Sequence, residues 1–309
     1  MKRRKIKNVA ASVRQRLLDE ARSSGRPFNE VLQYFAMERF LHRLSRSPHG
    51  ENFVLKGALM LVAWDVSLTR PTVDIDLLGH GANDIDRIVA VVKEICRQDV
   101  EPDGLDFDPG SVQAERIAAE AEYEGVRVRF RGNLGTARVA MRLDVVFGDA
   151  VVPGPVLADY PTILDLPTPR IRGYTRESTV AEKFHTMVRR GLLNSRMRDF
   201  FDVWGLSRQF DFDGGVLAAA IRETFACRGL EVAARPVAFT TEFAEAAANV
   251  AQWRGFLRKS RLEGAPSELA EVVEAIAVFL GPVAEALGEG RDFEGRWEAT
   301  GPWSGAGTD

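Results

Sequence analysis

Cysteine and histidine are scarce in this chain of 309 residues, which has only two of the first and four of the second. Cys96 and Cys227 stand far apart and belong to no metal-binding or redox motif, and the histidines are scattered. These absences exclude a disulfide-stabilised secreted scaffold and leave no pattern for a zinc site. We therefore expect a reduced, cytoplasmic protein.

Long hydrophobic runs are also missing, since none approaches the ~18 residues that would cross a bilayer. The basic first seven residues are followed by no apolar segment, so we expect no signal peptide. The formal net charge of −3 argues against a non-specific nucleic-acid coat protein. Basic residues nevertheless cluster at 2–7, 127–131 and 170–198. Such clusters could hold RNA phosphates, although a solvated tail or face is the simpler interpretation.

The composition, 45% hydrophobic and 28% charged, is that of a soluble globular protein, and the length indicates two domains. Apolar periodicity predicts helices at 9–24, 28–46, 57–65, 84–98, 176–192, 198–209, 214–227, 237–260 and 267–286. Alternation predicts a strand at 73–78 and a hairpin formed by 126–130 and 139–147. We expect an α+β protein, with helices and a mixed sheet in residues 1–165 and a helical domain with an irregular tail in residues 166–309.

The most informative motif is Asp74-Ile75-Asp76 inside an apolar run. Residues two apart on a strand point the same way, so the two carboxylates project from one face. We expect three apolar neighbours to pack on the other face: Val73, Ile75 and Leu77. Paired carboxylates commonly share Mg²⁺, which binds substrate phosphates. Solvated carboxylates are the simpler interpretation, but the apolar frame indicates burial, which requires compensation by Arg70 or by a metal.

A third carboxylate, Asp144, alternates with apolar residues in the predicted hairpin. If its strand lies beside that of Asp74 and Asp76, it would complete a metal site. The alternative is an ion pair with Arg142 or Arg138.

A second group of charged residues follows at 183–202. Lys183 and Arg190 lie beside the apolar arc of one predicted helix, where the lysine could reach a phosphate or extend into solvent. Asp199 and Asp202 share one border of the next predicted helix, where a solvated charge pair is the simpler expectation.

Together the two groups resemble the AbiEii/AbiGii family of toxin nucleotidyltransferases, which includes the MenT-type toxins. The family pattern is Leu-Lys-Gly-Gly, a helix, Arg-x-Thr/Ser-x-Asp-Ile-Asp, then Glu-Lys with a downstream Arg, and Arg/Lys-Asp-x-x-Asp. The matching residues are Leu55, Lys56, Gly57, Arg70, Thr72, Asp74, Ile75, Asp76, Glu182, Lys183, Arg189 or Arg190, Arg198, Asp199 and Asp202. The second glycine of the family pattern is Ala58 here, and Pro71 precedes the predicted metal strand.

The resemblance implies a polymerase β-like nucleotidyltransferase core and a bacterial toxin with a separately encoded antitoxin. It implies a nucleoside triphosphate (NTP) substrate, Mg²⁺ or Mn²⁺, and transfer to RNA, with the tRNA 3′ end as acceptor and a block of translation as the result. The implied metal ligands are Asp74, Asp76 and Asp144. The implied nucleotide-binding residues are Lys56, Gly57, Arg70, Thr72, Lys183 and Arg190. Asp199, followed by Asp202, would orient Lys183 or the base.

Two other hypotheses remain open at this point. The acceptor could be a small molecule or a protein instead of RNA. The chain could also be a nucleotide-binding protein without activity, although the presence of Asp74, Asp76, Lys183 and Asp199 argues against a decayed site.

Overall fold

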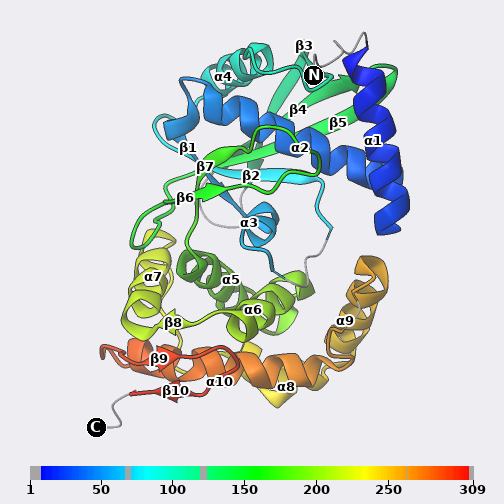
Figure 1. Ribbon diagram of the computed structural model, residues 1–309. Helices are drawn as coiled ribbons and strands as arrows, with labels where there is room; N and C mark the ends of the chain where they lie inside the picture. Colours follow the sequence, from blue (N-terminus) through cyan, green and yellow to red (C-terminus); the bar gives the residue numbers. More distant parts are fainter. Residues whose placement is uncertain (1–7, 67–70, 119–123, 263, 306–309) are drawn as a thin grey trace. The chain divides into compact units, whose positions relative to one another are not determined.

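The computed structural model describes residues 8–66, 71–118, 124–262 and 264–305 (Figure 1). It contains two compact units. The first comprises residues 1–63, 72–148 and 156–173, and the second comprises 64–71, 149–155 and 174–309. The first unit combines helices with a mixed sheet and the second is mainly helical, which confirms the predicted α+β class.

The first unit is built on a seven-stranded sheet with the order β3-β4-β5-β2-β1-β7-β6. Its central pair, β2 and β5, is parallel, as is β1 with β7, and the other neighbours are antiparallel. The strands are β1 (Phe53–Lys56), β2 (Asp74–Gly79), β3 (Leu105–Ala118), β4 (Glu124–Leu134), β5 (Ala137–Phe147), β6 (Val156–Asp159) and β7 (Arg170–Gly173). The helices are α1 (Val9–Ser24), α2 (Phe28–Arg46), η1 (Gly50–Asn52), α3 (Ala58–Ala63) and α4 (Ile85–Arg97).

The core of this unit lies between the sheet and helices α2 and α4. Helix α2 packs on β5 and β7, and α4 packs on β3. Phe40 of α2 contacts Phe107 and Phe130, whose ring centroids lie 5.7 and 5.0 Å away. Because side chains alternate along a strand, burying this face leaves the polar residues of β2, β4 and β5 on the other face.

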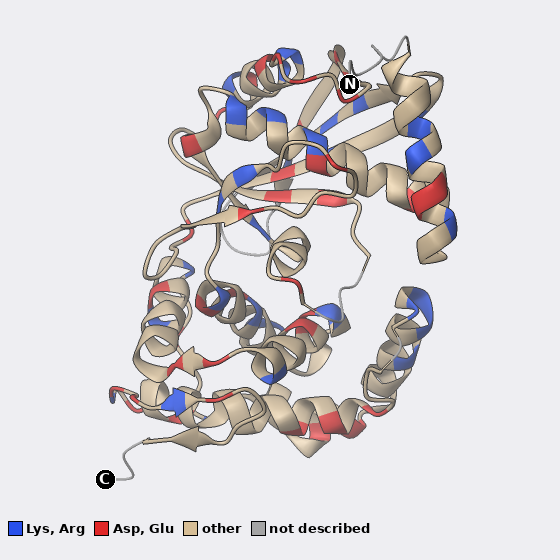
Figure 2. Cartoon of the chain, viewed as in Figure 1, with Lys and Arg blue, Asp and Glu red and all other residues tan. Residues whose placement is uncertain are grey.

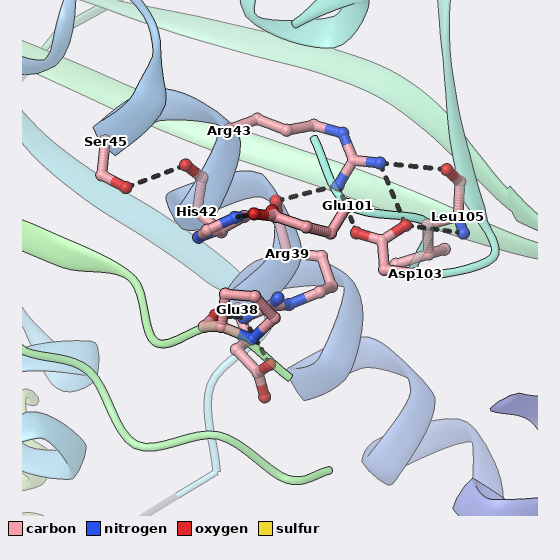
Figure 3. Close-up of polar contacts among 9 residues, drawn as sticks. Glu38, Arg39, His42, Arg43, Ser45, Glu101, Asp103 and Leu105 are labelled. Atoms are coloured by element: carbon pink, nitrogen blue, oxygen red, sulfur yellow. Dashed lines mark hydrogen bonds and ion pairs between the residues drawn. The ribbon is translucent and has the colours of Figure 1, made fainter. Parts of the chain in front are cut away.

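A buried charged network ties α2 to the loops around it (Figure 3). Arg43 donates two hydrogen bonds to Asp103, at 2.6 and 3.0 Å, and a third to the Leu105 carbonyl. Glu38 pairs with Arg39 at 2.8 Å and accepts a hydrogen bond from the Ile163 N–H. Burial raises the pKa of Glu38 to about 7, although Arg39 acts to lower it.

The second unit packs helices around aromatic side chains. Its elements are α5 (Arg176–Arg190), η2 (Gly191–Leu193), α6 (Met197–Gln209), β8 (Phe212–Asp213), α7 (Gly214–Cys227), η3 (Val237–Phe239), α8 (Thr241–Glu245), α9 (Ala247–Ser260), α10 (Leu269–Gly288), β9 (Arg296–Trp297) and β10 (Trp303–Ser304). The tail docks through its tryptophans, because the Trp297 and Trp303 indoles donate to the carbonyls of Ser207 and Phe279. Among the described residues, no helix is both long and apolar enough to span a membrane.

Several elements differ from the sequence prediction. Strand β3 was not predicted, because Pro109 and Gly110 interrupt its alternation, and the register shifts between Asp108 and Gln113 at that point. The single helix predicted at 237–260 is divided into η3, α8 and α9. Val73 was predicted to be packed but is 56% exposed, since it precedes the first residue of β2.

We predict that Asp103→Asn lowers the free energy of unfolding by about 3 to 5 kcal/mol, because it leaves the Arg43 guanidinium buried without a counter-charge. Asp159→Asn is the matched control, since Asp159 and its partner Arg170 are 73% and 71% exposed. We expect that change to stay within about 0.5 kcal/mol. Urea unfolding measures both values, and equal effects of the two substitutions would contradict the structural role of the buried pair.

Candidate functional site

The polar face of the seven-stranded sheet carries a charged residue on each of five neighbouring strands. Cross-strand register places these residues in one row, from β1 to β3: Lys56, Asp76, Asp144, Arg127 and Glu115. The next row carries Asp74 opposite Arg142. The parallel pairing of β2 with β5 places Asp144 directly beside Asp76, a position that the sequence analysis had left open, and Figure 2 shows the acidic positions on β2.

Arginines from neighbouring strands compensate two of these carboxylates. Arg142 donates to Asp74, its direct cross-strand neighbour. Arg127 holds both oxygens of Asp144, at 2.8 and 2.7 Å, and this hydrogen bonding raises the pKa of Arg127. The sequence-based choice of Arg142 or Arg138 as the partner of Asp144 was wrong, because Arg127 stands directly opposite on β4. Arg70, the other predicted counter-charge, lies outside the described residues.

Two features of the Asp74–Asp76 pair fit a divalent cation. The Oδ1 atom of Asp74 is buried without a hydrogen-bond partner. A Cβ added to Gly57 would stand 2.2 Å from Asp76 Oδ2, so only glycine leaves room for that carboxylate, and Gly57 has a φ of +69°. Carboxylate oxygens are the ligands that Mg²⁺ prefers, and one or two of them suffice when substrate phosphates supply others.

The described residues contain no cluster of three or more His, Cys, Asp or Glu that could hold a metal ion. Arg127 donates a hydrogen bond to each of the two Asp144 oxygens. The fit to a cation therefore rests on Asp74 and Asp76, and the ligand role of Asp144 stays a prediction.

Residues of the first motif surround this pair. Lys56 ends β1 as the cross-strand neighbour of Asp76 and is 9% exposed. The Thr72 backbone N–H donates to the Tyr34 hydroxyl at 3.0 Å. The Thr72 hydroxyl in turn accepts from the Asp74 N–H at 3.4 Å. Thr72 thus fixes the start of β2, where Asp74 stands.

The second group of predicted residues meets inside the second unit. Lys183 of α5 is 9% exposed, and its ammonium donates to Asp199 at 3.2 Å and to Asp202 at 2.7 Å. Asp199 also accepts from Arg196 Nε at 2.6 Å. The two aspartates are 1% and 3% exposed, so the expectation of a solvated pair was wrong. Burial occurs because α5 packs against α6 and the three charges satisfy one another.

The residue before this lysine belongs to a different network, which sequence reasoning missed. Glu182 accepts from Arg228 at 2.6 Å, and Arg228 also donates two hydrogen bonds of 2.9 Å to Asp149. Burial acts to lower the pKa of Arg228, but Glu182 and Asp149 more than offset it and raise the pKa. This network joins α5 to α7. Arg190, at the end of α5, is half-buried.

His185 follows on the same helix and is buried in neutral form. Its side chain is 1% exposed, its Nε2 has no hydrogen-bond partner, and its ring meets the Phe225 ring at 5.1 Å. Burial, reinforced by Arg228 and Arg189, lowers the pKa of His185 from 6.5 to about 4. The unfolded chain therefore binds a proton between these pH values that the folded chain does not.

We predict that the folded protein loses stability through His185 as the pH falls from about 6.5 toward 4, because the unfolded state binds the extra proton. Between pH 7 and pH 5 this effect should amount to roughly 1 to 2 kcal/mol. His185→Phe keeps a ring against Phe225 but cannot titrate. Urea unfolding of both proteins at the two pH values should show the smaller loss in His185→Phe, and equal losses would contradict a neutral buried histidine.

The family model described as "Nucleotidyl transferase AbiEii toxin, Type IV TA system" matches residues 39–276, well over half of the chain. Comparison with curated proteins gives no match. The solved structure of JHP933 from Helicobacter pylori is 14% identical, with a TM-score of 0.45 over 82% of this chain and 89% of that one. A second H. pylori structure, provisionally described as a nucleotidyltransferase, is 15% identical, with a TM-score of 0.44 over 84% and 95%.

The family match covers both groups of charged residues. The first is the row of charged residues across the sheet, between Lys56 and Asp144, and the second is the group around Lys183 at 183–202. It implies an enzyme that uses an NTP and a divalent metal, and a toxin that is paired with an antitoxin. The chain belongs to the AbiEii family of nucleotidyl transferase toxins.

Proposed function

We propose that this protein transfers nucleotides from an NTP to the 3′ end of an RNA, with tRNA as the acceptor, and thereby blocks translation. The observation that carries the proposal is the Asp74–Asp76 pair, with one buried carboxylate oxygen that has no partner. The RNA acceptor rests on the family resemblance, on Arg142 beside this pair on β5, and on the arginines of the following strand, β4.

In the transfer step, the acceptor hydroxyl oxygen forms a bond to the α-phosphorus of the NTP. The bond from that phosphorus to the bridging oxygen breaks, pyrophosphate leaves, and the hydroxyl proton passes to a carboxylate or to solvent. Asp74 and Asp76 would hold Mg²⁺, which when bound neutralises phosphate charge and stabilises the developing charge of the transition state. Asp144 is the candidate base, and Arg127 donates a hydrogen bond to each of its two oxygens.

The proposed nucleotide-binding residues around the carboxylates are Lys56, Gly57 and Thr72. Those of the second unit are Lys183 and Arg190. Arg70, which lies outside the described residues, belongs to the same predicted set. Asp199 and Asp202 accept hydrogen bonds from the Lys183 ammonium and so fix its position. A fixed cation of this kind stabilises charge on a triphosphate without a cost of reorganisation during the reaction.

We predict that Asp76→Ala abolishes nucleotide transfer and relieves toxicity on expression, because one carboxylate cannot hold the metal and triphosphate in line. Gly57→Ala should also reduce transfer strongly, because its new Cβ would displace the Asp76 carboxylate. Asp159→Ala, on the edge strand β6, is the control and should retain activity. The measurement is incorporation of labelled nucleotides into total RNA with Mg²⁺. Full activity of Asp76→Ala would overturn the assignment.

We predict that Lys183→Ala loses most activity, by roughly 2 to 4 kcal/mol in transition-state stabilisation, and that Lys183→Arg restores it poorly. The control is Lys259→Ala, which changes an exposed lysine and should retain activity. Since Lys183→Ala leaves buried aspartates without their cation, the charge-balanced variant Lys183→Gln with Asp202→Asn provides a second test. This double variant should unfold at a urea concentration close to that of the wild type and should remain inactive. If either folded variant keeps kcat/KM within about twofold of wild type, Lys183 has only a structural role.

A further inference from the structure

A groove of about 720 Å³ lies on the polar face of the sheet beside Asp74. It is lined by strands β3, β4 and β5, and its charged and polar lining includes Arg129, Arg131, Arg142, Gln113 and Ser111. We propose that this groove binds the acceptor strand of RNA, and that two surface carboxylates hold its arginines until phosphates replace them. This inference rests on the proposed transfer to RNA and adds the place where the acceptor binds.

Two exposed ion pairs stand at the groove. Arg129 pairs with Glu115 at 2.8 Å, with side chains 52% and 50% exposed. Arg131 pairs with Asp108 at 2.8 Å, with side chains 58% and 34% exposed. Exposed pairs of this kind contribute about 0 to 1 kcal/mol, so a phosphate can replace the carboxylate at little cost.

The third arginine of β4 is held differently. Arg127 makes two hydrogen bonds to Asp144, and these side chains are only 27% and 15% exposed. Arg127 does not line the groove, whereas Arg129 and Arg131 do. The basic stripe that the sequence shows at 127–131 therefore divides into one residue that anchors Asp144 and two that can exchange partners.

The spacing of the two exchangeable arginines favours a nucleic-acid strand over a free triphosphate. Arg129 and Arg131 stand two residues apart on one strand, so their Cα atoms are separated by about 6.7 Å. Successive phosphates of an extended single strand are separated by a whole nucleotide and suit this distance. Adjacent phosphates of an NTP are joined through single bridging oxygens and lie closer together than this spacing.

The lining beside Asp74 also suits a nucleotide. Val73 lines the groove and is 56% exposed, so it offers an apolar surface to a base or ribose. Gln33 and Gln113 add amide groups on the walls. Arg142, which pairs with Asp74, also lines the groove. A strand on Arg131 and Arg129 would therefore end beside the predicted metal pair.

The test removes the two carboxylates in one variant and the two arginines in another. The probe is a labelled single-stranded RNA of about 12 nucleotides with a free 3′ hydroxyl, a length within the usual range of single-strand sites. Asp108→Asn with Glu115→Gln should tighten RNA binding about three- to tenfold, because the arginines lose their competitors. Arg129→Gln with Arg131→Gln should weaken binding at least tenfold and make its salt dependence less steep.

The matched controls are Asp159→Asn and Arg170→Gln, which alter an exposed cross-strand pair elsewhere in the sheet and should leave affinity unchanged.

Binding of labelled NTP with Mg²⁺ is measured on the same variants and should not change. A loss of NTP binding with unchanged RNA binding in the arginine variant would overturn the inference and make the groove a triphosphate site. Unchanged or weaker RNA binding in the carboxylate variant would also overturn it. If wild type labels RNA while all groove variants match it in RNA affinity, the inference fails and the proposed function stands. If wild type neither binds nor labels RNA, both fail.

Discussion

The first unit depends on one electrostatic constraint: carboxylates on adjacent central strands of a sheet repel one another unless a cation lies between or beside them. Register sets Asp76 directly beside Asp144, and Asp74 two residues away on the same face. Arginines of β4 and β5 meet this constraint for Asp74 and Asp144. Lys56 is the cross-strand neighbour of Asp76, and the Oδ1 atom of Asp74 is buried without a hydrogen-bond partner.

The second unit shows the opposite arrangement of charge. There one ammonium, that of Lys183, lies between two buried aspartates, and Arg196 pairs with one of them. These hydrogen bonds hold the ammonium in place between α5 and α6. The neighbouring Glu182 serves the fold instead, because it joins α5 to α7 through Arg228.

Exposure separates the charges that hold the structure from those that can exchange partners. Arg43–Asp103 and Arg127–Asp144 are two-hydrogen-bond pairs with little exposure. Arg129–Glu115 and Arg131–Asp108 are single contacts near the surface. The same residue types on the same strand therefore differ in role, because desolvation and geometry differ from one row of the sheet to the next.

The sequence by itself determined the helices at 9–24, 28–46 and 214–227, the β4–β5 hairpin, and the common face of Asp74 and Asp76, because these follow from local periodicity. It did not predict β3, whose bulge interrupts the alternation. Tertiary structure alone decided three features: the ion pair of Arg142 with Asp74, the ion pair of Arg127 with Asp144, and the burial of Asp199 and Asp202. Each depends on which strands or helices are neighbours and in which register, and contacts between residues distant in sequence leave no local pattern.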